Sequence, residues 1–314
     1  MSSFDVISVG RVSVDLYSME PDVSFREEQQ FFKSIGGSPT NVAVAAARLG
    51  EKAALVTNVG SDDFGHYVLA KLQSFGVDTR FVGIDETQQT PLALAALTPP
   101  ESPQVVFYRG PEAPDTKLIA SQVPVEEIEA AKILWISQTS LAKEPTATTC
   151  LTWMKSRERK PDTILDLDYR PTLWKSESEA REMATRAIEL ATVVVGNREE
   201  IRVALGIENA DDAADELLRR GVRLAIIKLG AEGSLFATED ERILMPSSKV
   251  DVVCGLGAGD AFGGALCHGI LAGWDISKIG NFANAAGAIV SSRLTCADAM
   301  PSVSELEQML GAAA

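Results

Sequence analysis

The apolar positions along the chain alternate between short β-rich runs and longer runs with helical periodicity. The expected strands are residues 4–9, 53–58, 133–137, 163–167, 192–195 and 224–228. The expected helices are residues 41–49, 64–75, 146–157, 177–190 and 212–219, followed by a helix-rich final third at 258–272, 276–293 and 302–310. Repetition of strand and helix predicts an α/β fold, in which a mostly parallel sheet carries helices on both faces.

Two segments interrupt this alternation. Residues 23–34 and 90–109 have the pattern of extended strands with no helix between them, and a proline-rich stretch at 99–103 indicates a hairpin tip in the second. Such strands do not fit a strand–helix–strand unit, so we expect a small side sheet that covers the strand ends as a lid. No repeat or linker is evident, and we expect residues 1–314 to form one domain, with lid segments at about 15–35 and 90–110.

Composition narrows the class of partner. Hydrophobic residues make up 46% and charged residues 23% of the chain, as in an ordinary globular protein. The 29 basic and 44 acidic residues leave a net charge of −15, which argues against a nucleic-acid partner. No apolar run is long enough to span a bilayer and no signal peptide is evident, so we expect no membrane partner. Four cysteines without a CxxC pair favour free thiols and a cytoplasmic location.

The strongest local signal is the glycine-rich sequence GLGAGDAFGG at residues 255–264. It follows a β-rich run at 250–253 and opens a helical pattern. Small residues let backbone amides approach an anion, and a helix N-terminus adds unsatisfied N–H donors. Asp260, in the first helical turn, could accept a proton from an attacking hydroxyl. A tight turn with an ordinary aspartate is the alternative interpretation. The spacing matches neither a P-loop nor the GxGxxG pattern.

A second glycine pair, Gly36-Gly37, stands just before the helical pattern that contains Asn41. Paired glycines allow a ligand to lie against the backbone. The Asn41 amide offers both a donor and an acceptor, which suits a sugar hydroxyl. Taken alone, the same residues would be interpreted as a turn and a helix cap.

These two motifs, in this order, resemble the PfkB (ribokinase-like) carbohydrate kinase family over essentially the whole chain. The resemblance implies a three-layer α/β/α core with a small β-sheet lid, and phosphoryl transfer from ATP, with Mg²⁺, to a sugar. It implies that Asp260 is the catalytic base and that backbone amides stabilise the transferring group. The residues in this catalytic set are Gly257, Ala258, Gly259 and Asp260.

The resemblance also implies a nucleotide-binding set and a metal ligand. Glu200, in the sequence NREE, would act on Mg²⁺ through water; the tetrapeptide alone would be interpreted as a helix capping box. The nucleotide set is Asn197, Lys228, Gly230, Gly233 and Asn284. Cys254-Gly255-Leu256 departs from the Asp-Thr-Thr that the family often has there, which puts in doubt the monovalent-cation site of some relatives.

On the substrate side, Arg170 follows an expected core strand and Arg109 lies on an expected lid strand. Two guanidiniums converging on one pocket would suit the carboxylate of a sugar acid, although structural ion pairing is the alternative. The full predicted substrate set is Asp15, Gly36, Gly37, Asn41, Arg109, Asp168 and Arg170.

The segments DLDYRPTLW, GNREE and FYR resemble family members that phosphorylate the C6 hydroxyl of 5-dehydro-2-deoxygluconate in myo-inositol catabolism. Three alternatives stay open: 2-keto-3-deoxygluconate as the substrate, a neutral sugar such as fructose or ribose, and a non-catalytic sugar- or nucleotide-binding regulator. Because lid strands with exposed edges often pair, we also expect that a homodimer could form through the lid.

Overall fold

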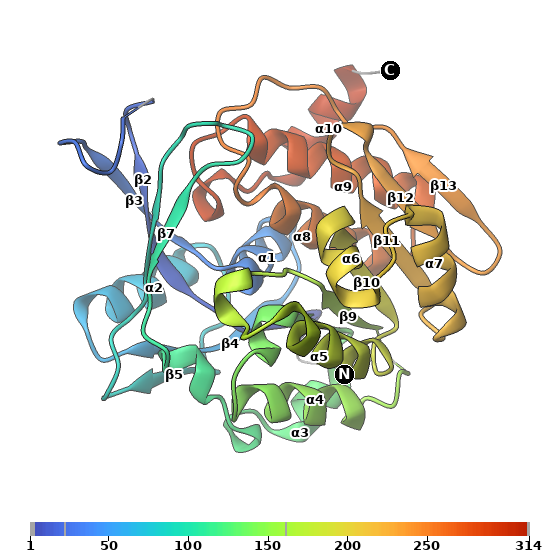
Figure 1. Cartoon of the computed structure of the whole chain (residues 1–314), viewed down its shortest axis with the longest axis horizontal. Helices are drawn as coiled ribbons and strands as arrows, with labels where there is room; N and C mark the ends of the chain where they lie inside the picture. Colours follow the sequence, from blue (N-terminus) through green and yellow to red (C-terminus); the bar gives the residue numbers. More distant parts are fainter. Residues whose placement is uncertain (1–3, 22, 161, 313–314) are drawn as a thin grey trace.

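The computed structural model describes residues 4–21, 23–160 and 162–312. Within them, a nine-stranded sheet crosses the molecule (Figure 1). From one edge to the other its strands are β13 (Arg242–Met245), β12 (Ser234–Ala237), β11 (Leu224–Lys228), β10 (Val193–Asn197), β9 (Asp162–Asp166), β8 (Ile133–Ser137), β1 (Val6–Val9), β4 (Ala53–Gly60) and β5 (Val82–Asp85). Neighbouring strands are parallel except at the β11–β12 and β12–β13 pairs, which are antiparallel.

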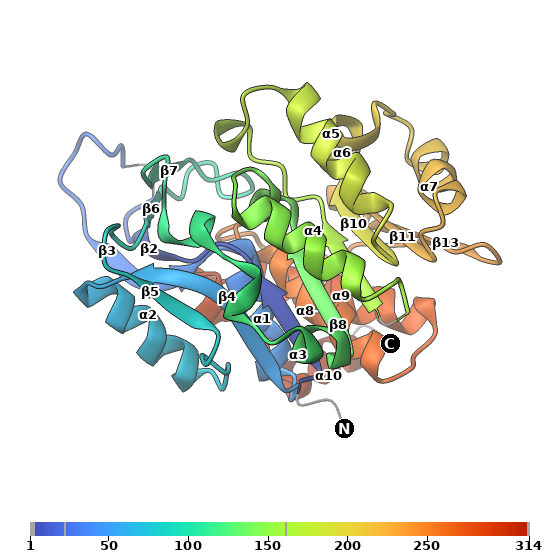
Figure 2. The ribbon, with the colours of Figure 1, turned by 90° about the horizontal axis from the view of Figure 1, so that it is seen from below.

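Helices cover both faces of this sheet, so the central strands β1 and β8 are buried along their whole length. Burial on both faces explains their continuous apolar sequences, VISV and ILWIS. One helical layer contains α1 (Ser38–Arg48), α2 (Asp63–Ser74), α8 (Ala258–Leu271), α9 (Ile276–Ser291) and α10 (Val303–Ala312). The other contains α3 (Val125–Ala130), α4 (Thr146–Ser156), α5 (Glu177–Ile188), α6 (Arg198–Leu205) and α7 (Ala210–Arg219), as Figure 2 shows.

A second sheet of four strands lies at one side of the core, beyond the end of β1 (Figures 1 and 2). Its order is β3 (Phe31–Gly36), β2 (Ser13–Ser18), β6 (Leu92–Ala95) and β7 (Val105–Tyr108). The predicted fold class, a three-layer core with a mostly parallel sheet and a small second sheet, is confirmed. The extended segment expected at 23–34 becomes a strand only from Phe31 onward.

Two sequence expectations about secondary structure need correction. The β-rich run at 250–253 is not a strand, because it leaves the sheet: the amides of Val253 and Cys254 donate to the carbonyl of Ser291 at the end of α9. The helices α3 and α6 were not expected as helices. The four cysteines are free and buried, and no helix among the described residues combines the length and apolarity needed to cross a membrane.

Candidate active site

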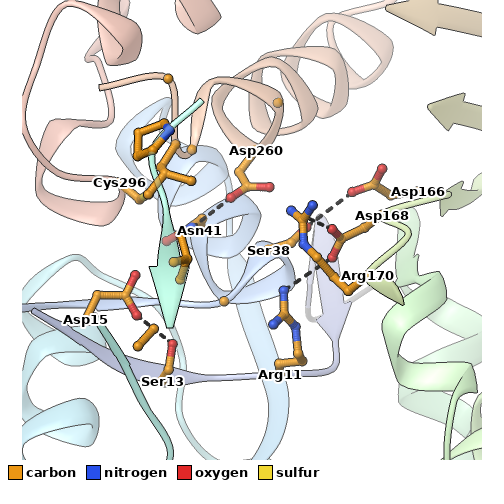
Figure 3. Close-up of a pocket in the computed structure, with 18 of the residues that line it drawn as sticks. Arg11, Ser13, Asp15, Ser38, Asn41, Asp166, Asp168, Arg170, Asp260 and Cys296 are labelled. Atoms are coloured by element: carbon orange, nitrogen blue, oxygen red, sulfur yellow. Dashed lines mark hydrogen bonds and ion pairs between the residues drawn. The ribbon is translucent and has the colours of Figure 1, made fainter. Parts of the chain in front are cut away.

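A cavity of about 480 Å³ lies where the carboxyl ends of the core strands meet the small sheet (Figure 3). This is the edge at which open α/β sheets bind ligands. The predicted residues that line it are Asp15, Gly37, Asn41, Asp168, Arg170, Asn197, Glu200, Lys228, Gly257, Gly259 and Asp260. The lining also includes residues that the sequence did not single out, among them Arg11, Ser38, Asp166 and Glu101.

Asp260 lies in the first turn of α8, which Gly257 caps in a left-handed conformation with φ +81°. The first amides of a helix have no intrahelical acceptor, so this turn offers N–H donors at the cavity wall. The Asn41 Nδ2 donates to Asp260 Oδ2 at 2.7 Å, which joins the two sequence motifs across 219 residues. The geometry therefore places a carboxylate beside a helix N-terminus, a position that favours anions.

The surroundings of Asp260 raise the pKa of its carboxyl group. Burial and the neighbouring Asp168 carboxylate raise the pKa of Asp260 to about 6, although hydrogen bonds from Asn41 and Ser38 oppose the shift. A carboxylate with a pKa of about 6 is ionised at neutral pH. It is also a stronger base than an ordinary aspartate, so it is better able to remove the proton of a hydroxyl.

Asp15, on β2, provides a second carboxylate on the small-sheet side of the cavity. Ser13 Oγ donates to its Oδ1 at 2.6 Å and Tyr17 OH donates to its Oδ2 at 3.0 Å. Gly36 does not line the cavity; a Cβ there would lie 1.9 Å from Asp15 Oδ2, so the missing side chain makes room for the carboxylate. Gly37 has a φ of +101°. A Cβ at this position would lie only 2.5 Å from the Arg11 carbonyl oxygen, so a side chain would clash with the backbone there.

On the opposite side, Asn197 and Glu200 form a capping box at the start of α6 and also line the cavity. The Glu200 amide donates to Asn197 Oδ1 at 3.0 Å, and the Asn197 amide donates to Glu200 Oε2 at 2.6 Å. Lys228 Nζ lies 3.9 Å from Glu200 Oε2. Burial lowers the pKa of Lys228, but four carboxylates, Glu200, Asp166, Asp260 and Asp168, together raise it above its ordinary value, so the amine is charged. The sequence NREE therefore forms a helix capping box, and its Asn197 and Glu200 also lie at the cavity, as a role toward nucleotide and metal requires.

Asp166, at the end of β9, is the most informative residue that the sequence interpretation missed. Its Oδ1 is buried without a hydrogen-bond partner, 3.9 Å from Lys228 Nζ, and burial raises its pKa to about 8. Together with Glu200 it offers the oxygen ligands that Mg²⁺ prefers. Among the described residues no group of three or more His, Cys, Asp or Glu side chains is arranged to hold a metal, so these residues fit an ion held mainly by phosphates and water.

The sequence predicts that Arg109 and Arg170 converge on one pocket, but only Arg170 lines the cavity. Asp115, in the 3-10 turn Pro114–Lys117, binds the Arg109 guanidinium bidentately at 2.7 and 2.8 Å, and Arg109 does not line the cavity. Arg170 does line it and pairs with Asp168 at 2.9 Å. The second guanidinium at the cavity belongs to Arg11, which follows β1.

Four other predicted residues lie outside the cavity lining. Asn284 accepts from Ser234 Oγ at 3.0 Å and donates to the Pro246 carbonyl at 2.9 Å, so its amide joins α9 to β12 and to the chain after β13. Gly230 and Gly233 bound the tight turn between β11 and β12. Ala258 opens α8. Their roles in nucleotide binding or catalysis stay predictions.

The hairpin between β6 and β7 reaches across the cavity to the glycine-rich loop. Glu101, Ser102 and Pro103 line the cavity, and the Gly255 amide donates to the Pro100 carbonyl at 2.7 Å. The tip expected from the prolines therefore contacts the same loop that precedes Asp260.

Comparison with known proteins agrees with this arrangement. Residues 3–303 match the model of the pfkB family carbohydrate kinases. The chain is 30% identical to a 5-dehydro-2-deoxygluconokinase of Bacillus subtilis, over 99% of this chain and 97% of that protein. It is similar to the fructokinase of Xylella fastidiosa with bound ATP (TM-score 0.86, 25% identity, 98% of each chain). It is also similar to a fructokinase of Vibrio cholerae bound to fructose, ADP and calcium (TM-score 0.87, 26% identity, 99% and 100% of the two chains).

Proposed function

Because this chain belongs to the pfkB family of carbohydrate kinases, we propose that it transfers the γ-phosphoryl group of ATP to the C6 hydroxyl of a sugar acid, 5-dehydro-2-deoxy-D-gluconate. The name of the Bacillus subtilis relative, matched over almost both full lengths, supports this substrate. The observation that carries the reaction is the position of Asp260, which lies partly buried in the first turn of α8 and accepts a hydrogen bond from Asn41.

Asp260 would act on the attacking hydroxyl. Its carboxylate takes the proton of the C6 hydroxyl as the oxygen of that hydroxyl forms a bond to the γ-phosphorus. The bond from that phosphorus to the β–γ bridging oxygen breaks, which releases ADP. Asp15 and Asn41 would hold sugar hydroxyls on the small-sheet side. The first-turn amides at Gly257 and Gly259, with Lys228, would stabilise negative charge on the transferring group.

Asp166 and Glu200 would hold the Mg²⁺ that accompanies ATP, partly through water. When bound, the ion would supply positive charge that neutralises negative charge developing on the phosphate groups. The nucleotides in the two fructokinase structures, and the calcium ion in one of them, support an ATP site with a divalent cation. The buried Oδ1 of Asp166 supports the same site, because it has no hydrogen-bond partner in the chain.

Replacing Glu200 with glutamine tests the metal role separately from the fold. Glutamine at the third helical position still accepts the hydrogen bond of a capping box, so the melting temperature should change little. Loss of the charge should raise the Mg²⁺ concentration for half-maximal activity by about 10-fold. Titration of activity with Mg²⁺ at saturating ATP measures this shift. An unchanged Mg²⁺ requirement would remove Glu200 from the metal site.

A substrate panel tests the proposed function directly. ADP release with Mg-ATP would be measured for 5-dehydro-2-deoxygluconate, 2-keto-3-deoxygluconate, fructose and ribose. We expect the highest kcat/KM for the first acid. Preference for the second acid would keep the mechanism and change the substrate. Turnover of neutral sugars alone would refute a sugar-acid kinase, and no turnover at all would favour a binding protein.

We also propose that two copies associate through the small sheet. Its edge strands are β3 and β7, and both carry exposed aromatic side chains, Phe31 and Phe32 on β3 and Phe107 and Tyr108 on β7. Unpaired edges with apolar side chains are surfaces that proteins usually cover. Light scattering should give a mass in solution of twice the chain mass of 33.5 kDa. The substitution Tyr108→Lys should lower this measured mass toward that of one chain. A monomer at the concentrations used for assay would contradict the proposal.

A further inference from the structure

Arg11 is a buried guanidinium with few partners at the wall of the cavity. It follows β1, is 8% exposed and lines the cavity. Its Nε is buried with no hydrogen-bond partner, and its Nη2 contacts Asp168 Oδ2 only at 3.5 Å. The ring of Phe107 covers the guanidinium at 5.7 Å. Because a guanidinium carries five N–H donors, this group is poorly satisfied by the chain.

The carboxylates around Arg11 are all engaged by other groups. Asp168 is shared with Arg170, which it contacts at the shorter distance of 2.9 Å. Asp115, a second carboxylate that acts on Arg11, is held bidentately by Arg109, and Asp15, a third, accepts hydrogen bonds from Ser13 and Tyr17. Burial, with Arg170 and Arg109, lowers the pKa of Arg11 despite Asp168 and Asp115. An anion beside Arg11 would pair with N–H donors that these carboxylates leave unsatisfied, the buried Nε among them.

The two arginines that line the cavity both contact Asp168, but their other charged neighbours differ. The charges that act on Arg170 include Glu200, Asp260 and Asp166, all on the phosphoryl-transfer side. The strongest charges on Arg11 are Asp168, Arg170, Arg109 and Asp115; Asp168 also acts on Asp260, whereas Arg109 and Asp115 lie on the small-sheet side. Figure 3 shows Arg11 on the wall with Ser13, away from Asp260 on α8. Arg11 is therefore the cation at the end remote from phosphoryl transfer.

We propose that Arg11, rather than Arg109, recognises the carboxylate of the sugar acid and sets the preference for acids over neutral sugars. The inference rests on the proposed function, in which Asp260 acts at C6. The carboxylate at C1 is at the opposite end of that molecule. With the C6 hydroxyl at Asp260, the carboxylate would extend toward the wall that holds Arg11. Charge-assisted pairing with a guanidinium is directional and strong, so it gives selectivity as well as affinity.

The test compares three single variants, Arg11→Gln, Arg11→Lys and Arg109→Gln, with the wild type. Values of kcat and KM would be measured for 5-dehydro-2-deoxygluconate and for fructose at saturating Mg-ATP, and melting temperatures would report folding. Arg11→Gln should raise the KM for the acid about 10- to 100-fold with a small change in kcat, and lower the acid-to-fructose preference by the same factor. Arg11→Lys should recover part of this loss. Arg109→Gln should keep the preference.

Each other outcome counts against the inference. If Arg11→Gln lowers activity on both substrates equally, Arg11 only supports the fold through Asp168. If Arg109→Gln loses the preference for the acid, the carboxylate binds at Arg109 after release from Asp115. If the wild type prefers fructose, the proposed substrate itself fails, which the wild-type measurements show before any variant is considered. Should Arg11→Gln not fold, the same comparison is made with Arg11→Lys, whose unchanged preference would overturn the inference.

Discussion

Replacing Asp260 with asparagine will lower kcat by about 10²- to 10⁴-fold, because an amide cannot take the proton of the attacking hydroxyl. The substitution preserves size, and the new amide oxygen can still accept the 2.7 Å hydrogen bond from Asn41. The fold and the binding of ATP should therefore persist. Steady-state ADP release measures the loss, with melting temperature and ATP titration as checks.

A matched control for this variant is Asp275→Asn. Asp275 caps α9 by accepting from the Lys278 amide at 2.7 Å, outside the cavity lining. Asparagine caps a helix as well as aspartate, so kcat should not change. The wild type adds a second readout: because only the ionised Asp260 accepts a proton, kcat should fall as the pH drops through about 6. Wild-type turnover by Asp260→Asn would eliminate the role of base.

Replacing Gly257 with alanine should lower kcat/KM by about 100-fold, through the backbone rather than through a lost side chain. A Cβ at this position would lie 2.7 Å from Cys296 Sγ and 3.0 Å from Cys296 Cα. The second contact involves backbone and cannot be relieved by a rotamer change, so the loop must move. That movement displaces the amides that we assign to the transferring phosphoryl group.

The control for Gly257→Ala is Gly273→Ala, at the other end of α8. Its φ of +68° resembles the +81° of Gly257, but nothing lies within 4 Å of an added Cβ. This variant should lose about 1–2 kcal/mol of stability from the left-handed conformation alone and keep its kinetics. Equal kinetic effects of the two substitutions would show that strain, and not displacement of the loop, is responsible.

The strands were predictable where both faces are buried. Residues 133–137 and 224–228 were expected with the bounds that β8 and β11 have, because a fully buried parallel strand is an uninterrupted apolar run. The same reasoning failed at 250–253, where valines lie beside the end of α9 instead of in the sheet. β-branched composition indicates an extended backbone but not its partner.

The candidate site was predictable where its residues lie in local motifs, as Asp260 and Gly37 do. Arg11 and Asp166 lie in no such motif; they reach the cavity because the ends of β1 and β9 meet at one edge of the sheet. Arg109 shows that a residue in a suitable sequence context can still lie outside the cavity lining. Its sequence context suited a carboxylate ligand, but a carboxylate of the chain itself, Asp115, lies six residues away and binds it.

The hydrogen bond from the Gly255 amide to the Pro100 carbonyl ties the β6–β7 hairpin to the loop before Asp260. Any outward movement of the hairpin breaks this bond and frees the glycine-rich loop from its partner. Movement of the hairpin to admit a sugar would then also release the loop that precedes Asp260. Opening of the hairpin would therefore loosen the glycine-rich loop whenever water could enter the cavity, so this hydrogen bond would favour phosphoryl transfer to the sugar over hydrolysis of ATP.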